Sequence, residues 1–121
     1  MLLYEELTRE IIGAAIEVHR VLGPGFLESV YESALAKELA ARKIHFKTQD
    51  PLKVMYKGES MGKFRTDILV ENKVVIEIKA LSHLTSEHTA QAIHYLTATR
   101  KKLALLINFG APRIAVKRVI L

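Results

Sequence analysis

The sequence contains no cysteine and no tryptophan, and it has only three prolines among 121 residues. Without cysteine the chain can form neither disulfides nor thiolate zinc sites, and it cannot use a cysteine nucleophile. No stretch approaches the about 18 consecutive apolar residues that a membrane-spanning helix needs. The N-terminal segment is acidic and amphipathic, unlike a secretory signal. We therefore expect a soluble, unexported protein, with the cytoplasm as its default location.

Half of the residues are hydrophobic and 26% are charged, which is typical of a globular protein. We expect one domain over residues 1–121, large enough to bury a core without a structural metal. Residues 1–41 carry three Lys/Arg against seven Glu, whereas residues 42–121 carry fifteen Lys/Arg against six Asp/Glu. The basic part is compatible with a polyanionic partner such as nucleic acid, but a modest excess of this kind is also common on ordinary solvated surfaces.

The apolar pattern predicts two helices followed by strands. Spacings of three and four predict a helix from about residue 3 to 22, and a second one from about 26 to 42 after Gly23-Pro24-Gly25. Strands are expected at 44–47, 52–56, 64–70, 74–80, 103–109 and 114–120, with a third helix from residue 85 or 86 to about 100. The order ααββββαββ indicates an α/β domain whose sheet is covered by helices.

Charged side chains interrupt the predicted strand 74–80. Because side chains alternate along a strand, Glu77 and Lys79 lie on the same face of it, with Cα atoms about 7 Å apart. Taken alone, the two would neutralise each other, because an unpaired buried charge costs several kcal/mol. With residues 71–73 as the hairpin loop, however, Asp67 lies opposite Glu77 on the same face. Two opposed carboxylates repel unless a cation lies between them, which favours an oxygen-liganded Mg²⁺ or Mn²⁺ over zinc.

These residues resemble the PD-(D/E)XK nuclease superfamily, whose core order is αβββαβ. The resemblance rests on Asp67, on Glu77-Ile78-Lys79 and on Gln91 in the following helix. Segment 25–31, Gly-Phe-Leu-Glu-Ser-Val-Tyr, is similar to the Gly-x-x-Glu-x-x-Tyr signature of the small prokaryotic GxxExxY family within that superfamily. Further similarities lie at 56–58, 65–67, 91–96 and 106–110. The resemblance implies a restriction-endonuclease-like mixed sheet flanked by helices.

The resemblance also implies roles for the strand residues. Asp67 and Glu77 would hold Mg²⁺ or Mn²⁺, with the backbone carbonyl of Ile78 as a further ligand. Lys79 would orient the attacking water or stabilise the transition state at phosphorus, and would anchor the phosphate. The superfamily's proline before the first acidic residue is absent here, since Thr66 precedes Asp67.

Two helices would contribute further residues by the same resemblance. Glu28 would reach the metal directly or through water, although a carboxylate is also favoured in the first turn of any helix. Glu32, one turn later, could substitute for it, and Tyr31 shares a face with Glu28. Gln91 would contact the site lysine, the water or the nucleic-acid backbone, and it shares a helix face with Tyr95. The alternative for Gln91 is a solvated amide.

Three histidines of this region, His83, His88 and His94, lack the partners of a zinc site, and we expect them at the surface or at a helix end. The predicted function is a Mg²⁺-dependent phosphodiesterase that acts on nucleic acid, with DNA preferred to RNA as the expected substrate. The alternatives are a non-catalytic module that binds nucleic acid or a protein on the same fold, and an accessory subunit in defence, toxicity or repair. In so small a chain, specificity would come from an accessory partner or from a homodimer.

Overall fold

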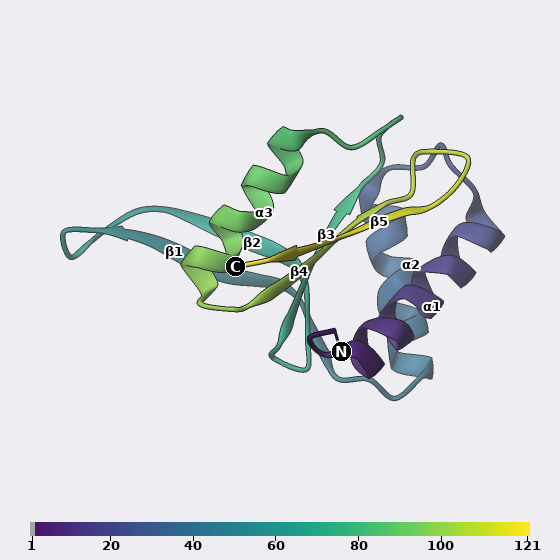
Figure 1. Ribbon diagram of the computed structural model, residues 1–121, viewed down its shortest axis with the longest axis horizontal. Helices are drawn as coiled ribbons and strands as arrows, with labels where there is room; N and C mark the ends of the chain where they lie inside the picture. The colour runs from purple at the N-terminus through teal and green to yellow at the C-terminus, as the bar shows by residue number, and fades with distance from the viewer. Residues whose placement is uncertain (1) are drawn as a thin grey trace.

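The computed structural model describes residues 2–121 as three helices and one five-stranded sheet (Figure 1). In chain order the elements are α1 (Glu5–Leu22), α2 (Glu28–Ala41), β1 (Phe46–Tyr56), β2 (Glu59–Val70), β3 (Val74–Lys79), α3 (Ser86–Thr99), β4 (Leu103–Asn108) and β5 (Ala115–Ile120). The strands lie in the order β1-β2-β3-β4-β5, and neighbours are antiparallel except for the parallel pair β3 and β4. The predicted α/β fold with a mixed sheet is confirmed.

Helices cover both faces of the sheet. Figure 1 shows α1 and α2 together on one side and α3 on the other. Ile68 and Ile76 belong to the hydrophobic cluster beneath α1 and α2, whereas Leu69 and Val75 belong to the cluster beneath α3. This alternation along β2 and β3 assigns every second side chain to the α3 face.

The first strands differ from the predicted order. The predicted strands 44–47 and 52–56 form one strand, β1, so the observed order is ααβββαββ. Pro51 does not end the strand because β1 is the edge of the sheet, where a residue without an N–H is tolerated. β2 also begins earlier than predicted, after a tight turn in which Lys57 and Gly58 have φ of 50° and 83°. Positive φ at both positions is the requirement of a type I′ hairpin turn.

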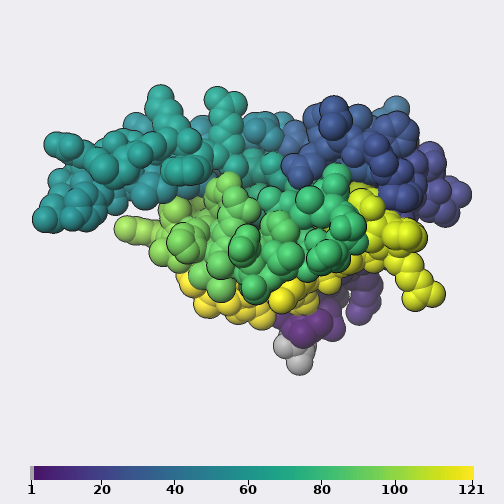
Figure 2. Space-filling view, turned by 90° about the horizontal axis from the view of Figure 1, so that it is seen from above, coloured from purple at the N-terminus to yellow at the C-terminus, as the bar shows by residue number. Residues whose placement is uncertain are grey.

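The far part of this long hairpin, residues 51–65, projects from the rest of the molecule, and we call it the arm. Figure 1 shows it extending past α3, and Figure 2 shows the arm and α3 side by side on one surface. Several large apolar side chains of the arm are exposed, namely Val54, Met55, Tyr56, Met61 and Phe64. The arm therefore has an apolar surface that the rest of the chain does not fully cover.

The hairpin between β2 and β3 has the predicted register. Val70 pairs with Val74, and Ile68 pairs with Ile76. Glu71 and Asn72 in the connecting turn have positive φ of 52° and 56°, as tight hairpin turns require. The same register, continued outward, sets Asp67 against Glu77.

The loop before α2 is held by Tyr31. Its side chain is fully buried and its ring stacks on Phe109, with centroids 4.7 Å apart. The Tyr31 hydroxyl donates to the carbonyl of Gly23 and accepts from the backbone N–H of Phe26 at 3.2 Å. Gly25, between them, has φ of 113°, which strongly favours glycine. Gly25 and Tyr31 thus fix the chain that leads into Glu28.

Replacing Tyr31 with Phe should destabilise the protein while leaving the ring stack intact. The variant loses both hydrogen bonds of the hydroxyl and leaves the groups around it without partners, at an expected cost of about 1–3 kcal/mol. Urea denaturation followed by circular dichroism measures the change. Tyr56→Phe is the control, because Tyr56 is 59% exposed and should change the unfolding free energy by less than about 0.5 kcal/mol. Equal effects of the two changes would contradict this role of Tyr31.

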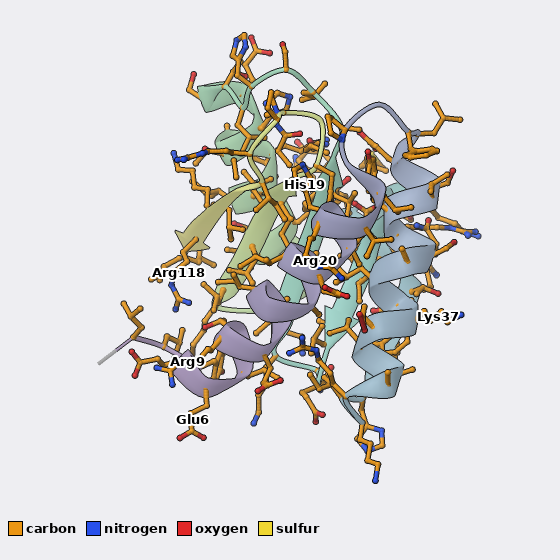
Figure 3. All side chains as sticks on the ribbon, turned by 90° about the vertical axis from the view of Figure 1, so that its right-hand side faces the viewer. Glu6, Arg9, His19, Arg20, Lys37 and Arg118 are labelled. Carbon is orange, nitrogen blue, oxygen red and sulfur yellow. The ribbon has the colours of Figure 1, made fainter. Side chains whose placement is uncertain are left out.

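Three hydrogen bonds join α1 and the residues just before it to the C-terminal part of the chain. The Arg118 guanidinium donates to the Thr8 hydroxyl at 2.9 Å and to the carbonyl of Leu3 at 2.6 Å, and His19 Nε2 lies 2.9 Å from the carbonyl oxygen of Ala111. Figure 3 shows Arg118 and His19 at opposite ends of α1.

Among residues 2–121 no helix has the length and apolarity to cross a membrane.

Candidate functional site

Asp67, Glu77 and Lys79 lie on the α3 face of the sheet. They follow the alternation set by Leu69 and Val75, which pack beneath α3. Glu77 is only 4% exposed, whereas Asp67 and Lys79 are half-buried. Two acidic groups and one ammonium group are therefore gathered on the α3 face of two neighbouring strands.

Asp67 is held against β3 by a backbone hydrogen bond. The N–H of Ile78 donates to Asp67 Oδ2 at 2.7 Å. Burial raises the pKa of Asp67, while this hydrogen bond, the charge of Lys79 and the side chain of Gln49 oppose the rise. The backbone of Ile78 therefore adjoins the Asp67 carboxylate, and its side chain packs into the opposite core.

Glu77 is the most perturbed acid of the site. Burial raises its pKa to about 8, and the negative charges of Asp67, Glu28 and Glu32 add to the rise, while Lys79 opposes it. Glu77 Oε1 is buried and has no hydrogen-bond partner in the described chain. A buried carboxylate oxygen without a donor is costly, so Glu77 needs either a proton or a cation.

This unpartnered oxygen is the test of whether a divalent metal fits. Mg²⁺ and Mn²⁺ prefer carboxylate oxygens, and Asp67 and Glu77 supply them on adjacent strands. Burial and mutual repulsion disfavour the two acids as separate anions, and a bound cation removes both penalties. The residues therefore fit an oxygen-liganded divalent metal.

The acids of α2 are near this pair but do not complete a three-carboxylate cage. Within residues 2–121 no three His, Asp or Glu side chains are grouped closely enough to ligate one ion. Glu28 is exposed at the first residue of α2, whereas Glu32 is half-buried and accepts from Gln49 Nε2 at 2.6 Å. Burial raises the pKa of Glu32, and the charge of Asp67 adds to the rise. Gln49 and the charge of Asp67 thus both act on the Glu32 carboxylate.

Lys79 is in contact with α3. Its ammonium donates to Gln91 Oε1 at 3.2 Å, which brings together two residues that the sequence placed on separate elements. Tyr95, one turn after Gln91, is half-buried, and burial together with the charges of Glu77 and Asp67 raises its pKa. The middle of α3, at Gln91 and Tyr95, therefore faces the site.

Two residues that the sequence reasoning missed hold the chain after β3. Asn108 is fully buried; its Oδ1 accepts from the N–H groups of Leu81 and Gly110, and its Nδ2 donates to the carbonyl of Leu81. A Cβ atom at Gly110 would lie 2.2 Å from the nitrogen of Leu81, so only glycine fits there. Because this contact fixes the backbone directly after Lys79, it helps to position the lysine. In the sequence, the family resemblance of segment 106–110 was the one signal that pointed to Asn108 and Gly110.

Gln49 was also missed. Gln49 lies in the edge strand β1 with φ of 51°, an uncommon value outside glycine. Its side-chain amide donates a hydrogen bond to Glu32. A glutamine before Asp50-Pro51 gives no sequence signal of this role, since the two residues after it suggest a turn.

The histidines do not join the carboxylates. His88 Nδ1 accepts from the backbone N–H of Thr85 at 3.0 Å and caps the start of α3, while His83 and His94 are exposed. The described chain therefore offers hard oxygen ligands, an ammonium and an amide at this site.

Comparison with known proteins agrees with this arrangement. Residues 5–119 match the sequence model of the PD-(D/E)XK nuclease superfamily. The crystal structure of a protein named SSO0001 is similar, with a TM-score of 0.65 at 19% identity over 97% of this chain, which shows a common fold. The chain spans 59% of that protein's own length. No curated protein matches the chain by sequence. Since the family match extends over nearly the whole chain, the chain belongs to the PD-(D/E)XK nuclease superfamily.

Proposed function

We propose that this protein is a metal-dependent nuclease that hydrolyses phosphodiester bonds of nucleic acid, in particular DNA. The observation that carries the proposal is Glu77, whose buried oxygen lacks a partner beside Asp67 and within the field of Lys79. A purely structural ion pair would satisfy its own carboxylate. A bound cation and phosphate would compensate the free-energy cost of burying a carboxylate oxygen without a partner.

Asp67 and Glu77 would hold Mg²⁺ or Mn²⁺, with the carbonyl of Ile78 as a further ligand. When bound, such an ion polarises a phosphate and lowers the pKa of a coordinated water. The Ile78 N–H fixes one oxygen of Asp67 and leaves the other for the ion. Glu28 or Glu32 would act through water, because neither completes a direct cage.

Lys79 would bind the phosphate and stabilise the charge that develops on it during attack by water. Gln91 would hold the ammonium in place through the hydrogen bond at 3.2 Å. This contact leaves the remaining donors of the ammonium for a phosphate oxygen, since a lysine has three. Lys79 is thus the catalytic cation, and Gln91 its positioning residue.

We further infer that the chain belongs to the GxxExxY branch of the superfamily. The motif residues divide into two kinds in a way that supports this. Gly25 and Tyr31 form the turn before α2, whereas Glu28 is exposed at the start of that helix and its charge raises the pKa of Glu77. The motif would therefore combine a carboxylate with the turn that presents it to the site.

A binding module without hydrolysis is the second candidate. It is favoured by the arm, which carries four Lys/Arg against one Glu. In the described chain the ion pairs are Glu17–Arg20 and Glu10–Arg42, so none of the arm's cations is neutralised by a carboxylate. A polyanion would supply that neutralisation whether or not it is cut. A homodimer or an accessory protein remains the proposed source of any finer specificity.

The discriminating assay compares Mg²⁺, Mn²⁺ and Ca²⁺ on single-stranded, duplex and branched DNA. Cleavage with Mg²⁺ or Mn²⁺ that stops when EDTA is added supports the nuclease. Tight binding without cleavage under every condition would replace it with the binding module.

The affinity for nucleic acid should fall steeply with salt in either case. Residues 42–65 carry seven Lys/Arg against two acids, and each phosphate that they contact releases counterions. With about three to five such contacts, raising NaCl from 50 to 200 mM should weaken binding by roughly 40- to 500-fold for a duplex, and less for a single strand. Fluorescence anisotropy with a labelled oligonucleotide measures this. An affinity independent of ionic strength would point to a protein as the natural partner.

A further inference from the structure

A groove lies between the arm and α3, next to the candidate site. It has a volume of about 360 Å³, within the range of pockets that take small organic groups. Its walls are Leu52, Val54 and Phe64 from the arm, and Ala90, Gln91, His94, Tyr95 and Ala98 from α3. Figure 2 shows these two parts of the chain along one face of the molecule. The groove is largely apolar, with three rings and one amide in its lining.

The rings of this groove have no aromatic partner. In the part of the chain that the structure describes, the aromatic contacts are His19–Phe109, Phe26–Tyr31 and Tyr31–Phe109. Phe64 is 46% exposed and Tyr95 is half-buried. An exposed phenylalanine beside a groove is costly in water and is well suited to stack on a planar group.

The groove adjoins the candidate site through Gln91 and Tyr95. Gln91 lines it and at the same time accepts the hydrogen bond of Lys79. Tyr95 lines it and lies within the electrostatic influence of Glu77 and Asp67. A planar group in the groove would therefore be adjacent to any phosphate held by Lys79, as a base is to the phosphate of its own nucleotide.

The charge of the arm selects an anionic occupant. Lys53 and Lys63 are directly paired across β1 and β2, and like charges in that position repel. Neither forms an ion pair within the described residues, so their repulsion is relieved only by a ligand or by solvent. An aromatic groove beside an unneutralised basic ribbon is the combination with which proteins bind single-stranded nucleic acid.

We propose that this groove binds an unpaired nucleobase of the strand to be cut, with Phe64 as the stacking residue, so that the substrate is single-stranded or frayed nucleic acid. The inference rests on the proposed function, because it assumes that Lys79 holds the neighbouring phosphate. A base within an intact duplex is stacked on both sides and cannot enter the groove without being flipped out, which costs a few kcal/mol. Unpaired strands avoid this cost.

The test measures binding without catalysis. Labelled single-stranded DNA, single-stranded RNA and duplex DNA of equal length are titrated in EDTA with the full chain, and anisotropy is recorded. Phe64→Ala should weaken single-strand binding by about 5- to 150-fold, the range that loss of one stacked base gives, and should change duplex binding less than twofold. Phe64→Leu retains apolar bulk and should lose nearly as much if stacking is the cause. Tyr56→Ala is the control, because Tyr56 is another exposed aromatic of the arm and lies outside the groove.

A fluorescent base analogue such as 2-aminopurine gives a readout that a structural defect would not mimic. Its emission should change when the single strand binds wild type and Tyr56→Ala, and should stay unchanged with Phe64→Leu. A Phe64-dependent preference for either the DNA or the RNA strand supports the groove, and the comparison identifies which sugar is preferred. Equal affinity for duplex and single strand, or an equal loss of both in Phe64→Ala, would overturn it and favour insertion of the arm into a duplex groove. If single strands bind through Phe64 but Mg²⁺ produces no cleavage, the nuclease proposal fails while the groove stands.

Discussion

Replacing Asp67 with Asn or Glu77 with Gln is expected to reduce Mg²⁺-dependent cleavage by about 100- to 1000-fold. Each change removes a negatively charged ligand from a proposed metal that contributes several kcal/mol to the transition state, and each 1.4 kcal/mol is a factor of ten in rate. Asp67→Asn also removes negative charge beside the proposed phosphate site, and Glu77→Gln does so at a pH above about 8, where this carboxyl is ionised, so binding of nucleic acid in EDTA should be retained or strengthened. The cleavage rate should therefore fall in these variants while the affinity for nucleic acid does not.

Lys79→Ala is the contrasting variant. It removes the cation that would contact the phosphate, so both cleavage and affinity should decline. Lys53→Ala on the arm is the matched control, because it removes one cation far from the acids and should weaken binding without abolishing turnover. Gel assays give cleavage rates and anisotropy gives affinity. Carboxylate variants that cut as fast as wild type would assign the cleavage to a contaminant or to another site.

The pairing of the two acids could be predicted from sequence because one hairpin determines it. Residues 71–73 are polar and turn-forming, the flanking residues alternate, and together they allow a single register in which both apolar faces are buried. Asp67 and Glu77 then follow by counting. The same alternation cannot determine how far an acid on a helix extends, so the roles of Glu28 and Glu32 at the metal stay predictions. In the structure Glu32 accepts from Gln49, and the charge of Asp67 raises its pKa.

The arm could not be predicted in this way. Residues 59–63, Glu-Ser-Met-Gly-Lys, lack the alternation of a half-buried strand, because this part of β2 has no core to face. Its extended form comes from pairing with β1 over the type I′ turn. Asp50-Pro51 suggested a turn, and the position of β1 at the sheet edge removed the reason for one. The groove between the arm and α3 exists because β2 extends through residues 59–63 and because β1 continues through Asp50-Pro51.

The stability of the metal-free protein should fall as pH rises from about 5 to 8.5. Glu77 has a pKa of about 8 in the folded chain against 4.5 for an ordinary Glu, so over this window the folded state binds a proton that the unfolded state has lost. Stability is therefore complete below the unfolded pKa and is lost as pH rises through the folded one. At 1.4 kcal/mol for each unit, this acid contributes a loss of about 2–4 kcal/mol. Asp67 and Glu32, whose pKa values are also raised by burial, act in the same direction at lower pH.

Glu77→Gln isolates this contribution, because the amide stays neutral at every pH. Denaturation in EDTA at pH 5 and pH 8.5 should give nearly the wild-type difference for Glu59→Gln, an exposed acid on the arm, and a much smaller difference for Glu77→Gln. Mg²⁺ should stabilise wild type at pH 8.5, where the carboxylate is charged, by an amount that grows with the logarithm of its concentration. It should stabilise Glu77→Gln far less. Wild-type stability that is independent of pH and of Mg²⁺ would mean that Glu77 is already satisfied within the fold, and the case for a metal at Asp67 and Glu77 would fail.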